Sequence, residues 1–118
     1  RVLFRSPPRL VEKQLQQATV RQVLEVGPQR FIASVRVKPA YEAKRFIGYR
    51  LLGFSANSPL ASGNTVVPGD VIITVNGVSL ERPEQFMSAW KSVGERKSLD
   101  LLLRRGTERI LFRWKIVP

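Results

Sequence analysis

Residues 69–77 constrain the fold more than any other stretch, because they form the pattern turn, buried strand, turn. Gly69 can take a positive φ before Asp70, and residues 71–75 are β-branched, as is typical of a buried strand. Asn76-Gly77 follows, the dipeptide most typical of a two-residue hairpin. The pattern predicts a strand over residues 71–75, a hairpin turn and a short return strand.

Residues 83–93 are predicted to form an amphipathic helix. Pro83 suits the first turn, where an N–H would be unpaired in any case, and Gly94 is the expected C′ residue. Arg82 is a poor N-cap because its side chain offers no acceptor. One apolar stripe at i, i+3, i+4 and i+7 consists of Phe86, Ala89, Trp90 and Val93.

The C-terminal segment predicts a hairpin, with strands at residues 99–105 and 108–117 joined by Gly106-Thr107. The second strand alternates sharply, and we expect its apolar face to be buried. That face carries Ile110, Phe112, Trp114 and Ile116.

The first part of the chain has weaker patterns. Residues 1–18 are expected to be a linker or N-terminal extension, within which residues 9–17 fit either a helix face or a short edge strand. Thr19 is the expected N-cap of a short helix over residues 20–26, which Gly27-Pro28 ends.

The next part of the chain predicts two strands. Residues 31–38 alternate and predict a half-buried strand that Pro39 ends. A loop over residues 40–45 leads to an apolar, strand-like segment at residues 46–54, and residues 57–68 are mostly loop. Together the elements predict an α+β domain: a partly open β-barrel capped by one main helix, with a short N-terminal helix.

The length of 118 residues favours a single domain, which we place at residues 19–118. The chain begins at Arg1 and has no long apolar run or signal peptide, so we expect an excised fragment whose targeting segment lies upstream in the parent. The net charge of +11 is uneven: residues 1–50 hold 11 Lys/Arg against 3 Asp/Glu, and residues 51–118 hold 9 against 6. Such a charge fits nucleic acid, an anionic membrane surface or an acidic protein partner.

An enzyme is not expected. The chain has no histidine and no cysteine, which excludes Ser-His-Asp and Cys-His arrangements and any His or Cys metal cluster. The carboxylates are scattered, and the glycines do not form a phosphate loop. We therefore predict no catalytic residues, no metal and no cofactor.

The order Ser58-Pro59-Leu60-Ala61, a short loop and then residues 69–77 resembles the centre of a bacterial PDZ domain. PDZ domains bind extended peptides by strand addition beside a helix, after a loop of the pattern apolar-Gly-apolar. The resemblance implies a groove between a strand at residues 49–52 and the helix at residues 84–93. The candidate groove residues are Phe46, Ile47, Gly48, Tyr49, Leu51, Gln85 and Ala89. Ile47, Leu51 and Ala89 also fit an ordinary core role.

The helix at residues 19–24, the strand ending at Pro39 and the segment Arg45-Phe46-Ile47-Gly48-Tyr49-Arg50-Leu51 extend the likeness. They resemble the periplasmic PDZ domain of general secretion pathway protein C, the inner-membrane component of type II secretion. This resemblance implies a periplasmic domain whose parent is anchored in the inner membrane by a segment absent here. The implied partners are the secretin, other secretion-system components and exoproteins.

Two other readings stay open. One is a regulatory PDZ domain of an HtrA-like periplasmic serine protease that binds exposed C-termini; the other is a basic nucleic-acid binder. A single membrane helix upstream would favour the secretion component, whereas a protease domain upstream would favour the HtrA-like protease. Specific nucleic-acid binding is not expected, because most of the basic residues stand singly between apolar ones.

Overall fold

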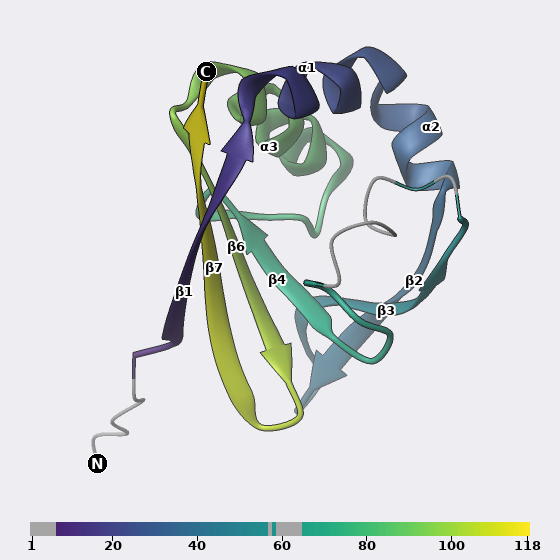
Figure 1. Cartoon of the computed structure of the whole chain (residues 1–118). Helices are drawn as coiled ribbons and strands as arrows, with labels where there is room; N and C mark the ends of the chain where they lie inside the picture. Colours follow the sequence, from purple (N-terminus) through teal and green to yellow (C-terminus); the bar gives the residue numbers. More distant parts are fainter. Residues whose placement is uncertain (1–6, 57, 59–64) are drawn as a thin grey trace.

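The computed structural model describes residues 7–56, 58 and 65–118 as one curved sheet with helices gathered at one end (Figure 1). The strands are hydrogen-bonded in the order β1-β7-β6-β4-β3-β2, and β5 pairs with β4 alone. β1 runs parallel to β7, and the other pairs are antiparallel. The elements are β1 (Arg9–Gln16), α1 (Gln17–Val26), α2 (Pro28–Ala33), β2 (Val35–Glu42), β3 (Arg45–Phe54), β4 (Val71–Val75), β5 (Val78–Ser79), α3 (Pro83–Glu95), β6 (Ser98–Arg105) and β7 (Glu108–Val117).

The core joins the middle of the sheet to the loop before β4. Its buried members are Leu51, Val66, Leu103, Ile110 and Phe112. Partly buried side chains pack against them from β1, β2, β3, β4, β6 and β7: Val11, Val35, Phe54, Ile72, Leu101 and Trp114. The expected α+β class is confirmed: a mixed sheet of seven strands has a main helix across one end and a short N-terminal helix (Figure 1).

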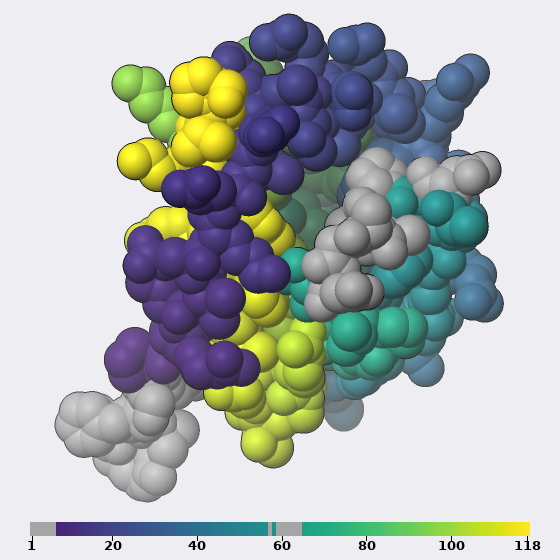
Figure 2. All heavy atoms as spheres, in the orientation of Figure 1, coloured from purple at the N-terminus to yellow at the C-terminus, as the bar shows by residue number. Residues whose placement is uncertain are grey.

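β1 settles the open alternative for residues 9–17 in favour of an edge strand. It pairs with β7 along its whole length, from Arg9 opposite Ile110 to Gln16 opposite Val117. In Figure 2 it lies across β7 on the visible face of the molecule. The extension was expected over residues 1–18. Most of the part that the structure describes, residues 9–16, belongs to the sheet.

The helix expected over residues 20–26 exists but begins earlier, at Gln17. No side chain caps it, so the N-cap predicted at Thr19 is wrong. Its end is as predicted: Gly27 has a φ of 89°, and its N–H donates to the Leu24 carbonyl at 3.1 Å.

The strand predicted over residues 31–38 is wrong in its first part, where α2 stands. Pro28 occupies the first turn of α2, and the ring of Phe31 lies 5.4 Å from that of Trp90 on α3. Over so few residues, an apolar side chain at every second position does not separate a strand from a helical turn.

β2 also continues through Pro39, so the strand end predicted there and most of the loop predicted over residues 40–45 are wrong. Proline is tolerated in a strand at the edge of a sheet, where its missing N–H need not join a ladder. β2 is such an edge strand.

The second half of the chain follows the predictions closely. β4, β6 and β7 lie within one residue of their predicted bounds, and Asn76 and Gly77 have φ angles of 50° and 78°, as a type I′ hairpin turn requires. α3 runs to Glu95, so Gly94 is not its C′ residue. Gln85 Oε1 accepts the N–H of Arg82 at 2.9 Å, which compensates for the poor cap. On β7, Ile110 and Phe112 are buried, whereas Trp114 and Ile116 are half-buried.

Candidate functional site

β3 cannot accept an added strand where the groove strand was predicted. Tyr49 pairs with Pro39 of β2 on one side and with Ile72 of β4 on the other. Two residues further on, the Leu51 N–H donates to the Asp70 carbonyl and the Leu51 carbonyl accepts the Gly69 N–H, both at 2.8 Å. Both edges of residues 49–51 are occupied, so the prediction of a groove strand at residues 49–52 is wrong.

β2 is one of the two strands that end the sheet, and β1 is the other. Among the residues that the structure describes, β2 has β3 as its only partner. Six of its eight residues are exposed, including Val37 at 40% and Tyr41 at 64%. Sequence reasoning missed this edge, although Pro39 within an alternating run was a usable signal for it.

The predicted groove residues are not brought together as one wall. Leu51 and Ala89 are core residues, each 2% exposed. Gly48 is buried beneath β4, where a Cβ atom would collide with the Ile72 carbonyl oxygen. Gln85 caps α3, and the main neighbours of α3 are β5 and α1 rather than β3.

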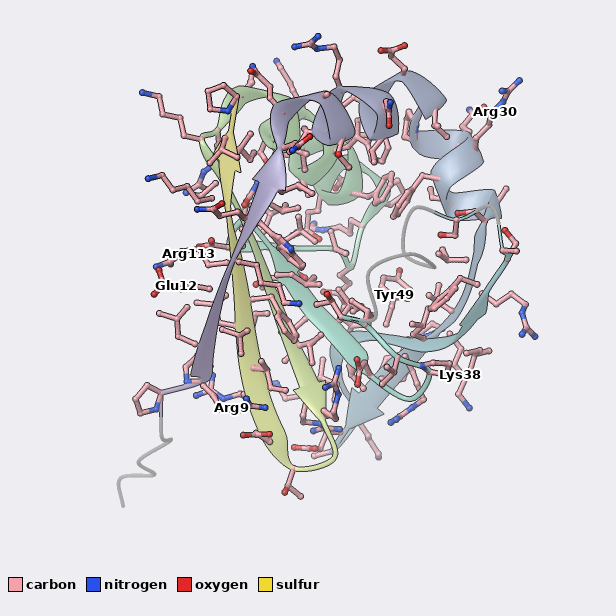
Figure 3. The ribbon with its side chains drawn as sticks, viewed as in Figure 1. Arg9, Glu12, Arg30, Lys38, Tyr49 and Arg113 are labelled. Atoms are coloured by element: carbon pink, nitrogen blue, oxygen red, sulfur yellow. The ribbon has the colours of Figure 1, made fainter. Side chains whose placement is uncertain are left out.

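Two of the remaining candidates on β3, Phe46 and Tyr49, form an aromatic group with Tyr41 of β2. The ring of Phe46 lies 5.2 Å from that of Tyr49 and 6.1 Å from that of Tyr41. Phe46 and Ile47 also line a shallow hollow of about 300 Å³ with Ile73 and other residues of β4, β5, β6 and β7. Figure 3 shows Tyr49 on the inner side of the curved sheet.

α3 is held in place by one buried side chain in the hairpin turn. Asn76 is 8% exposed. Its Nδ2 donates to Ser92 Oγ on α3, and its Oδ1 accepts the N–H of Asp100 on β6, both at 2.8 Å. The turn therefore fixes the helix against the sheet.

An ion pair made by a buried carboxylate fixes the loop before β4. Asp70 is 1% exposed and accepts two hydrogen bonds from Arg105 at 2.9 and 2.8 Å, and a third from the Val67 N–H at 2.9 Å. The hydrogen bond from Arg105 to Asp70 raises the pKa of Arg105. Arg105 also donates to the Thr65 carbonyl at 2.9 Å, so one guanidinium ties β6 to both ends of residues 65–70.

Some of the other charged side chains form surface pairs. Arg113 makes a bidentate contact with Asp100 at 2.9 Å, which together with nearby Glu12 raises its pKa (Figure 3). Arg9 bonds Glu108 at 2.8 Å and lowers the pKa of that carboxyl. Within residues 7–56, 58 and 65–118, no group of acidic side chains is suited to hold a metal ion, and no helix is long and apolar enough to cross a membrane.

The topology, with a free strand edge beside a sheet capped by a helix, is that of PDZ domains, and the predicted resemblance is confirmed for the fold. The structure of the PDZ domain of EpsC from Vibrio cholerae matches with a TM-score of 0.57 and 19% identity, over 83% of this chain and 92% of that one. The PDZ domain of the pullulanase C protein of type II secretion from Klebsiella pneumoniae, solved in complex with fatty acid, matches with a TM-score of 0.53 and 21% identity, over 81% and 98%. No protein-family model and no curated protein matches the sequence.

Proposed function

We propose that this domain is a protein-interaction module that binds an extended segment of a partner as an additional strand on the free edge of β2. One observation carries the proposal: β2 ends the sheet with its outer edge unpaired by any described residue, in a fold whose members bind ligands by strand addition. An extended segment would gain backbone hydrogen bonds that the free domain leaves to water.

The setting we propose is the periplasmic part of an inner-membrane component of type II secretion. The likeness of the fold to PDZ domains from that system supports this setting. In it, the partner would be the secretin, another secretion-system component or an exoprotein. The rival setting is an HtrA-like protease, in which the segment would be an exposed C-terminus.

The test is a titration of isotope-labelled domain with the periplasmic part of the secretin and with free C-terminal peptides. We expect changes in NMR chemical shift and slower amide exchange in residues 35–42. A peptide methylated on alternate backbone nitrogens is the matched control, because it keeps the side chains and loses the ladder donors. Equal binding of the methylated peptide, or shifts that leave residues 35–42 unaffected, would exclude strand addition.

A further inference from the structure

The two faces of β2 differ chemically, and its register with β3 shows how. Directly opposed residues of neighbouring strands share a face of the sheet. Val37 lies opposite the buried Leu51 and is therefore on the core side. Lys38 lies opposite Arg50, on the other face. The register with β3 shifts between Arg36 and Val37. Val35 packs against the core, as Val37 faces it, so Arg36 between them lies on the face of Lys38. Over residues 35–38, the free edge thus alternates apolar side chain and cation.

The cations of the β2–β3 hairpin are not neutralised within the described protein. The hairpin holds one acid, Glu42, which pairs with Arg104 of β6 at 2.7 Å. None of the ion pairs formed by residues 7–56, 58 and 65–118 includes a cation of this hairpin. Those cations are Arg36, Lys38, Lys44, Arg45 and Arg50. With five cations and one acid, the hairpin carries a net charge of +4, and Arg36 and Lys38 lie on its free-edge strand.

Lys38 stands in an unfavourable position in the free domain. Like charges directly opposite each other on neighbouring strands are destabilising, and Lys38 is directly opposite Arg50. Arg50 turns one N–H to the Gly69 carbonyl at 3.2 Å, whereas Lys38 lies at the outer rim of the hairpin (Figure 3). A carboxylate on a strand added next to β2 would lie opposite Lys38 and offset this repulsion.

We infer that the segment bound at β2 carries acidic side chains at alternating positions, opposite Arg36 and Lys38, and an apolar side chain between them, opposite Val37. This inference rests on the proposed strand addition and specifies its partner: an acidic, extended protein segment. The two charges need to be two residues apart, because only that spacing places both on the face of Arg36 and Lys38.

The test uses three blocked octapeptides in which valine or threonine alternates with glutamate, glutamine or lysine. We expect the glutamate peptide to bind about tenfold more tightly than the glutamine peptide, from two cross-strand charge pairs. The lysine peptide is expected to bind most weakly. Raising the salt concentration should reduce the preference for glutamate, because the pairs are exposed.

Charge reversal tests the assignment to Arg36 and Lys38. In R36E/K38E, the preference should invert, so that the lysine peptide binds more tightly than the glutamate peptide. The matched control is R21E/K115E, which makes the same change in net charge at exposed positions on α1 and β7. That variant should keep at least half of the wild-type preference for glutamate.

The outcomes separate the inference from the proposed function. If all three peptides bind at β2 with equal affinity, strand addition stands and the acidic specificity is wrong. If none binds at residues 35–42, the proposed function itself fails. If instead anionic phospholipid vesicles or duplex DNA bind through Arg36 and Lys38 while the glutamate peptide does not, the cations serve another polyanion and the inference is overturned.

Discussion

A side chain at Gly48 has no room, because its Cβ would meet the Ile72 carbonyl and Val71 of β4. The clash is with backbone, which cannot move without breaking the pairing of β3 with β4. At Gly53, by contrast, the Cβ would meet only the guanidinium end of Arg36, which can swing away. The two glycines of one strand thus differ sharply in what they tolerate.

We predict that Gly48→Ala destabilises the domain by about 3 kcal/mol, as overpacking against a fixed neighbour does. Gly53→Ala is the control and should stay within about 1 kcal/mol of wild type. Urea unfolding of both variants measures the difference. Equal losses in the two variants would show that close approach to β4 is not what selects glycine at position 48.

The Asp70–Arg105 pair is asymmetric, since the Arg105 side chain is 39% exposed and that of Asp70 is 1% exposed. Arg105→Met would leave a buried carboxylate with its hydrogen bond from Val67 as the main compensation. We predict a loss of about 3 kcal/mol. Asp70→Asn should cost less, because the exposed guanidinium can turn to water. Thermal unfolding of the two variants checks the order, and a larger loss in Asp70→Asn would contradict it.

β1 is an edge strand that nevertheless contributes to the core, because Val11 packs against the buried cluster. We predict that removal of residues 1–16 lowers the midpoint of thermal unfolding by several degrees and promotes association, since β7 then presents an unpaired edge. Removal of residues 1–7 alone should change neither. Calorimetry and light scattering report the two effects, and an unchanged, monomeric long truncation would mean that β1 is dispensable.

The elements that sequence predicted well are those with redundant signals. β4 has β-branched residues and a hairpin dipeptide after it, and α3 has an apolar stripe and Pro83 at its start. The errors cluster at residues 28–45, where Phe31 and Ala33 alternate by coincidence within a helix and Pro39 lies inside a strand. The groove strand was misplaced for the same reason: without β2 as a full strand, nothing in the sequence indicated that β3 is covered on both sides.

The net charge of +11 makes some attraction to DNA unavoidable. Because this electrostatic attraction acts on phosphates rather than on bases, we predict weak DNA binding without sequence preference. Affinity should fall about a hundredfold between 50 and 200 mM salt if roughly four phosphates are neutralised. Fluorescence anisotropy with two unrelated duplexes measures both properties. Selective binding that survives the higher salt would favour the nucleic-acid reading over an interaction module.

The parallel pairing of β1 with β7 gives the domain a mechanical property. Arg9 begins β1 beside Ile110, and Val117 ends β7 beside Gln16, so the two ends of the chain leave the sheet in opposite directions (Figure 1). A pull between the termini therefore shears the ladder along its length and loads its hydrogen bonds together instead of opening them one by one. The fold should resist tension between its two ends better than tension applied across β2 and β3, whose antiparallel ladder can unzip from its open end at Val35 and Phe54.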